Sequence, residues 1–209
     1  MRKNFFSLAG IKIFRLFPLI FFFAVQIYPQ AKSNLELFYQ LIDSSSSLVS
    51  NKIDTNEINA ELTFSGNFSV FKNQFVMGME KRGKKISSFS DSAAVLNYVL
   101  ENADIKYGEM FRSSFLGDYL IEREARIEGN FSVRNLSEAD NHSYKNYPFN
   151  IYYMDTIKVE DINTLENPQF PFTQDEVPPE PFFSSIWIPI VAVTTAAAAI
   201  YLFFSIRSK

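Results

Sequence analysis

Hydrophobic and polar positions alternate with a period of two in two long segments of this chain. The first segment covers residues 57–70 and the second covers residues 119–134, where Arg123 is the exception on the apolar face. A period of two places successive side chains on opposite faces of a strand, so each segment predicts a β-strand with one buried face. Both segments contain Gly-Asn-Phe-Ser-Val in the same phase, at 66–70 and at 129–133. This recurrence indicates either an internal duplication or chance.

Apolar residues recur at helical spacing before the first of these segments, which predicts a helix over residues 34–52. Ser33 precedes this helix, and Glu36 follows three residues later, which is the pattern of a capping box. Ser44 to Ser47 interrupt the apolar pattern. We interpret these serines as part of the solvated face of the helix.

The pattern between and after the alternating segments is mixed. Residues 72–82 predict a helix that ends at the following glycine, and residues 86–89 predict a short strand. Residues 93–111 allow a helix in their first half, and we favour a strand in their second half. Residues 112–117 predict a hairpin turn, and residues 151–157 predict a further strand.

The N-terminal segment has the charge order of an export signal. Residues 1–15 are basic and contain no acid, and residues 16–25 form an apolar run that is too short to span a bilayer comfortably. We therefore expect residues 1–31 to be a secretory signal peptide that is cleaved after Ala31. An uncleaved signal anchor is the alternative.

The C-terminal segment predicts a transmembrane helix over residues 186–206, which carries no charge. A helix of this length spans about 31 Å, close to the roughly 30 Å of the hydrocarbon core. Trp187 and Tyr201 suit the two interfaces, and Arg207 and Lys209 follow in a predicted cytoplasmic tail, 207–209. These four residues are the predicted membrane anchor, and the basic end orients the rest of the chain outward.

Val177-Pro-Pro-Glu-Pro181 precedes the apolar segment, and two basic residues follow that segment. This tail resembles the sorting tail of exosortase substrates, which has Val-Pro-Glu-Pro, an apolar helix and a basic end, although this chain has one extra proline and only two basic residues. The resemblance implies a tail that is processed, and a permanent anchor is the alternative.

These elements together predict an α+β fold. We expect a single small extracytoplasmic domain over residues 33–160, with an antiparallel, one-faced sheet and two or three helices, plus one C-terminal transmembrane helix. An acidic, proline-rich stalk over residues 161–185 would join the two. The order of helices and strands resembles the layout of small domains of bacterial envelope lipoproteins, and a shared layout implies no function.

Composition and charge exclude several classes of function. The chain has no cysteine and one histidine, His142, which excludes disulfide scaffolds and the commonest transition-metal sites. All 23 acidic residues but only 14 of the 20 basic residues lie between residues 32 and 180, so this part has a net charge of −9. Such a surface repels phosphate backbones, and we expect no nucleic-acid partner.

Few residues suggest chemistry. Glu122 and Glu124 point the same way on a predicted strand, where alternation with arginine favours a solvated face. His142 lies in a polar stretch and is interpreted as a surface residue. One basic cluster could contact an anionic partner, and it comprises Lys81, Arg82, Lys84 and Lys85.

The sequence therefore favours a non-enzymatic binding or scaffolding module, displayed outside the cytoplasmic membrane and without a cofactor. Its expected partners are the lipid bilayer and an envelope protein or polymer. A membrane-tethered hydrolase that uses carboxylates or a Ser–Lys pair is the alternative. A pocket with convergent acids would favour the hydrolase, and a flat polar face would favour the binding module.

Overall fold

The computed structural model describes residues 31–87, 93–114, 117–135 and 144–207. The chain divides into two compact units, Met1–Ala31 and Lys32–Lys209. The predicted signal peptide lies almost wholly outside the described residues, so the account below concerns the second unit. The side chains of residues 182–188 and 206–207 are not described either.

A five-stranded sheet forms the centre of the domain, in the order β2-β1-β3-β4-β5. The strands are β1 Glu57–Phe64, β2 Lys85–Ile86, β3 Ala94–Arg112, β4 Tyr119–Arg134 and β5 Lys145–Lys158. Strand β4 is antiparallel to both β3 and β5, whereas β1 is parallel to both β2 and β3. The predicted antiparallel sheet is therefore wrong, because the sheet is mixed. A helical crossover separates β1 from β3, and such a connection permits parallel pairing, which alternation alone cannot reveal.

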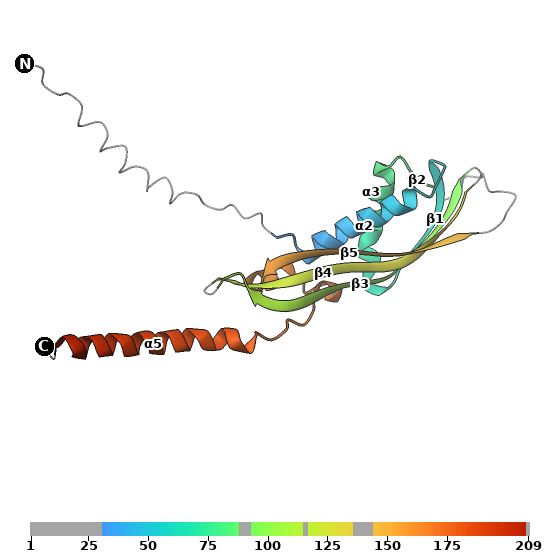
Figure 1. Cartoon of the computed structure of the whole chain (residues 1–209). Coiled ribbons are helices and arrows are strands. Elements are labelled where there is room, and N and C mark those ends of the chain that lie inside the picture. The colour runs from blue at the N-terminus through green and yellow to red at the C-terminus, as the bar shows by residue number, and fades with distance from the viewer. Residues whose placement is uncertain (1–30, 88–92, 115–116, 136–143, 208–209) are drawn as a thin grey trace, which may run out of the picture. The chain divides into compact units, whose positions relative to one another are not determined.

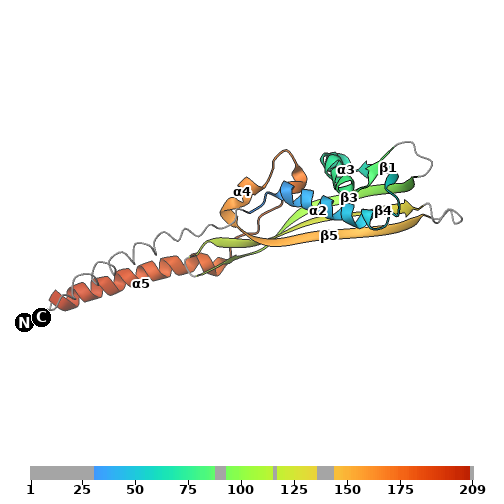
Figure 2. The ribbon, with the colours of Figure 1, turned by 90° about the horizontal axis from the view of Figure 1, so that it is seen from above.

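Helices cover one face of this sheet. The helical elements are α2 Asn34–Ser50, η1 Gly66–Phe71, α3 Lys72–Lys81, η3 Val159–Asp161, α4 Ile162–Leu165, η4 Pro171–Thr173 and α5 Phe182–Arg207. Helix α2 contacts α3, β4 and β5, and both helices lie on the same side of the long strands (Figure 1). The view turned by 90° shows α2 running along these strands (Figure 2). The predicted capping box is present, since Ser33 and Glu36 cap each other at the start of α2.

The core lies between the helices and alternate residues of the strands, as the period of two predicts. Its fully buried members include Phe38, Ile42, Phe71, Phe75, Leu96, Tyr98, Leu100, Ile121 and Ile127. The alternate positions on the other side of the sheet are polar and at least partly exposed along most of β4. The sheet is therefore one-faced, which agrees with the prediction.

Helix α2 buries two of the serines that the sequence places on its solvated face. Ser45 and Ser46 are almost fully buried. A Cβ atom added to Gly78 of α3 would lie 2.3 Å from Ser46 Oγ, so the two helices approach closely at this point. The interpretation of these two serines was wrong. Ser46 meets the small Gly78 of α3, and the Ser45 hydroxyl lies 3.0 Å from the Tyr98 hydroxyl of β3, and no pattern in α2 reveals either contact.

The first alternating segment is a strand only in its first half. Strand β1 ends at Phe64, and Gly66 has a φ of 52°, which turns the chain into η1. The strand predicted as far as residue 70 is therefore too long. Residues 94–112 show the opposite error, because all of them belong to β3 and the helix allowed in their first half is absent.

The packed part of the chain continues beyond residue 160. Ile162, Leu165 and Thr173 are buried, and the ring of Phe172 contacts the ring of Phe38 in α2. Farther on, α5 is a helix of 26 residues that includes the predicted span. Within the part of the chain that the structure describes, no helix reaches the length and apolarity of a membrane span. The transmembrane assignment of residues 186–206 therefore stays a prediction.

Candidate functional site

The open face of the sheet, on the side opposite the core, is a polar surface that several strands build together. The register aligns Asp104 of β3 with Arg126 of β4, and Arg126 with Tyr152 of β5. Two residues further along β3, on the same face, Lys106 aligns with Glu124. These side chains lie opposite the core because the strands alternate, so their arrangement follows directly from the pairing.

The carboxylates in the middle of this face form ion pairs. Arg126 pairs with Glu124 and lies 3.6 Å from Glu128, and the hydrogen bond to Glu124 raises the pKa of the guanidinium. Asn150 Nδ2 donates to Glu128 Oε1 at 2.9 Å. Both carboxylates therefore already have hydrogen-bonding or ionic partners on the sheet itself. Glu122 and Glu124 share this face, as the alternation predicts.

A second polar cluster lies on the core face of the sheet, around the arginine that breaks the apolar pattern. Arg123 is 0% exposed, and its Nε and Nη2 atoms donate to the two carboxylate oxygens of Asp155 at 2.9 and 2.6 Å. Its Nη1 atom donates to the carbonyl of Lys32 at 2.9 Å and to Asn34 Oδ1 at 2.6 Å. The buried charge is thus paired and hydrogen-bonded, as a stable buried ion requires.

This cluster extends to the segment that follows β5. Asn34 Nδ2 donates to the Tyr107 hydroxyl at 3.1 Å and to the carbonyl of Thr173 at 2.7 Å. The Tyr107 hydroxyl in turn donates to Glu166 Oε1 at 3.0 Å, and burial raises its pKa. The cluster therefore fastens the start of α2 and the segment 166–173 to the same end of the sheet, which is a structural role.

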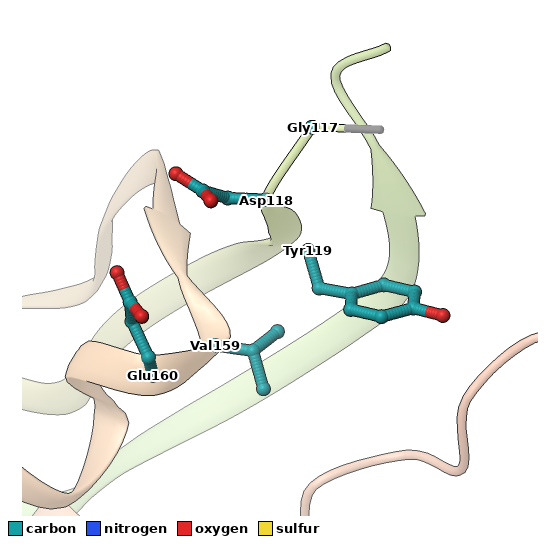
Figure 3. A pocket seen from close by; sticks show the side chains of 5 residues that line it. All are labelled: Gly117, Asp118, Tyr119, Val159 and Glu160. Carbon is teal, nitrogen blue, oxygen red and sulfur yellow. The ribbon is translucent and has the colours of Figure 1, made fainter. Parts of the chain in front are cut away.

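A hollow of about 390 Å³ lies at the turn between β3 and β4. Its lining comprises Gly117, Asp118, Tyr119, Val159 and Glu160 (Figure 3). Lys158 lies 2.7 Å from Asp118 and 3.3 Å from Glu160, and these partners raise the pKa of its ammonium group. Because the carboxylates share one cation, the hollow is not a site of two convergent free acids.

The predicted basic cluster is divided between structural and exposed residues. Arg82 lies 3.0 Å from Asp43, and its hydrogen bond lowers the pKa of that carboxyl. Lys84 is buried, and its Nζ donates to two backbone carbonyls, those of Ile53 and Thr55. Lys81 and Lys85 are exposed. Contact with an anionic partner stays a prediction, and it now depends on these two lysines.

The structure shows little of the remaining predicted site residues. His142 and Lys209 lie outside the described residues, and the side chains of Trp187 and Arg207 are not described. Tyr201 lies exposed on α5. Among the described residues, no group of three or more histidine, cysteine or acidic side chains could hold a metal ion. The sequence analysis did not predict the Arg123 cluster, although an arginine on an otherwise apolar strand face was the signal that could have indicated it.

Comparison with known proteins does not assign the chain to a family. No family model and no curated protein matches the sequence. Among solved structures, the chain is similar to a minor lipoprotein of Acinetobacter baumannii, with 11% identity over 50% of this chain and 67% of the other, and a TM-score of 0.32. It is also similar to the rare lipoprotein B of Shewanella oneidensis, with 15% identity over 73% and 95% of the two chains, and a TM-score of 0.31. Likenesses at this level carry no argument about function.

Proposed function

We propose that this chain is a non-enzymatic binding module of the cell envelope and that its binding surface is the open face of the sheet. One observation supports this proposal above the others. On that face the carboxylates of Glu124 and Glu128 flank Arg126, which pairs with both of them. Such a surface offers hydrogen bonds and alternating charge over an extended area, which suits a macromolecular partner.

The hydrolase alternative receives no support from the described residues. Glu124 and Glu128 are held by arginine, and Asp118 and Glu160 share Lys158. The buried lysine, Lys84, donates to main-chain carbonyls rather than to a serine hydroxyl. A nucleophile needs a base within hydrogen-bonding distance, and these contacts leave the candidate bases engaged elsewhere.

The proposed anchor is the C-terminal helix. Residues 186–206 carry no charge and lie within the 26 residues of α5. A helix satisfies its own backbone hydrogen bonds, which is the requirement for entering the bilayer core. We propose that α5 holds the domain at the outer face of the cytoplasmic membrane, with Arg207 and Lys209 on the cytoplasmic side.

The binding surface can be tested by a pair of charge exchanges in the full-length chain. Glu61→Lys with Lys106→Glu changes two exposed residues on the open face and leaves the net charge unchanged. Lys72→Glu with Glu80→Lys does the same on the exposed surface of α3 and is the matched control. The measurement is the amount of protein or glycan that co-purifies with each variant from membranes solubilised in mild detergent.

We expect the open-face exchange to reduce the co-purified partner at least about tenfold, which corresponds to about 1.4 kcal/mol of binding free energy. The control exchange should leave the amount unchanged, and both variants should melt within a few degrees of the wild type. Equal losses in the two variants, or a loss in the α3 variant alone, would contradict the assignment of the open face.

The anchor has a separate test that does not depend on the binding surface. A reporter that is active only outside the cytoplasm should be active when fused after Glu180 and silent when fused after Lys209. The wild-type chain should also remain in the membrane pellet after alkaline carbonate treatment. An active reporter after Lys209, or complete extraction by carbonate, would contradict the proposed topology.

A further inference from the structure

Strand β5 forms one edge of the sheet. It pairs with β4 along its whole length, and within the part of the chain that the structure describes no strand lies on its other side. Edge strands expose unpaired backbone groups, and proteins protect them with lysine, proline or bulges. In β5 such residues stand only toward the ends, at Lys145, Pro148 and Lys158. The stretch from Phe149 to Ile157 has no lysine, proline or bulge, and its one charged residue, Asp155, points to the core face and pairs with Arg123.

The middle of this stretch is also apolar and exposed. Tyr152 is 62% exposed, Tyr153 is 40% exposed and Met154 is 54% exposed. Because successive residues of a strand point to opposite faces, Tyr152 and Met154 lie on the open face and Tyr153 lies on the helix side. An edge that is apolar on both faces is typical of a pairing surface rather than of a solvated strand.

We propose that β5 pairs antiparallel with β5 of a second copy of this chain, about a two-fold axis at Tyr153. This pairing would join two five-stranded sheets into one continuous sheet, with the helices of both copies on the same side. The inference does not rest on the proposed function, but it would extend the open face across both copies.

Charge favours a second copy as the occupant. The part of the chain between residues 32 and 180 has a net charge of −9, so most of its surfaces repel an identical copy. The stretch from Phe149 to Ile157 contains a single charged residue, Asp155, and Arg123 already neutralises it. Two copies can therefore meet along this edge without bringing uncompensated charges together.

The register about Tyr153 is also self-complementary. A two-fold axis perpendicular to the sheet keeps the open faces together, so residues equally far from Tyr153 face each other. Tyr152 then faces Met154 of the second copy, and Asn150 faces Thr156. The first pair brings an aromatic ring beside a thioether, which is a favourable contact, and the second pairs two polar side chains. Asp155 faces Ile151, so no like charges are directly opposed.

The absence of cysteine gives this proposal a sharp test, because an introduced cysteine is unique. Directly opposed residues of antiparallel strands have Cα atoms about 4.5–5.5 Å apart, which a disulfide can bridge. Tyr153→Cys in the full-length chain should therefore form a covalent dimer when native membranes are oxidised. Glu61→Cys, which is exposed on β1, is the control and should stay monomeric.

The register is tested by mixing two tagged chains. Tyr152→Cys and Met154→Cys should cross-link to each other more efficiently than either cross-links to itself. Tyr153→Lys should abolish the dimer in light scattering of the detergent-solubilised full-length chain and keep the wild-type melting curve, because the side chain is partly exposed. Three results would overturn the proposal. They are a monomeric wild type, equal dimer formation by Tyr153→Cys and its control Glu61→Cys, and a Tyr153→Cys product whose mass is not twice that of the chain.

Discussion

The sequence Gly-Asn-Phe-Ser-Val occurs twice in this chain and has two different structures. At Gly66–Val70 it forms most of the 3-10 helix η1, and at Gly129–Val133 it lies within strand β4. The two stretches have identical side chains, so local propensity cannot explain the difference. The cause must be the contacts that each stretch makes with the rest of the chain.

The glycines show how these contacts act. Gly129 lies between Leu100 of β3 and Phe149 of β5, and an added Cβ atom would come 2.2 Å from the carbonyl oxygen of Val99. Gly66 has open space around its Cα atom but has a φ of 52°, which L-residues rarely adopt. One glycine is thus required by close packing in a sheet, and the other by the conformation of a turn.

The phenylalanines differ in the same way. Phe131 is almost fully buried and stacks on the ring of Tyr147 in β5. Phe68 is only partly buried and contacts the rings of Phe71 and Phe172. The strand copy is therefore fixed by two neighbouring strands, whereas the helical copy is fixed by a local turn and a few aromatic contacts.

The largest effect is expected at Gly129. Gly129→Ala should lower the free energy of unfolding by roughly 4 kcal/mol, because the new methyl group meets a main-chain oxygen that cannot move without breaking the β3–β4 pairing. Pulse proteolysis of the full-length chain in a urea series measures this change. A loss below about 1 kcal/mol would show that the strands separate easily at this point.

The next effect compares the two phenylalanines. Phe131→Ala should cost roughly 3–4 kcal/mol, as expected when a buried aromatic ring leaves a cavity. Phe68→Ala should cost about half as much, because its ring is partly solvated in the native state. The same proteolysis assay compares the two variants, and equal losses would mean that η1 is packed as firmly as β4.

A smaller effect is expected at Gly66. Gly66→Ala should cost about 1–2 kcal/mol because alanine is strained at positive φ, although there is space for its methyl group. Gly66→Asn should cost less, since asparagine tolerates this conformation better than alanine. If the order of the two variants were reversed, strain would not be the reason for this glycine.

The smallest effect concerns strand propensity. Ser132→Val on the open face of β4 should stabilise the domain by a few tenths of a kcal/mol, up to about 1 kcal/mol, because β-branched residues suit strands. Ser69→Val in η1 is the matched change and should be neutral or slightly destabilising. Equal effects of the two substitutions would show that strand propensity does not distinguish the two stretches.

The same contrast explains which features the sequence could predict. Strand β4 has the predicted bounds, and α2 begins at the predicted cap, because both signals are local. The end of β1 depends on Gly66, and its parallel pairing with β3 depends on a crossover, so alternation could reveal neither.

The site follows the same division. Alternation alone predicts that Glu122, Glu124 and Arg126 share one face of the sheet. The partners of Arg123 could not be predicted, because Asp155 and Asn34 lie 32 and 89 residues away in the chain. Long-range partners of a buried charge are set by the packing of whole elements, which the sequence pattern does not contain.

The most direct test of the proposed function is photo-crosslinking from the two faces of the domain in living cells. A photoreactive amino acid would replace, one at a time, the exposed open-face residues Glu61, Lys106 and Glu122, and the exposed helix-side residues Gln40, Lys72 and Met77. The proposed function predicts adducts of one discrete partner from the open face and few or none from the helix side. Adducts that arise mainly from the helix side, or equally from both faces, would contradict it.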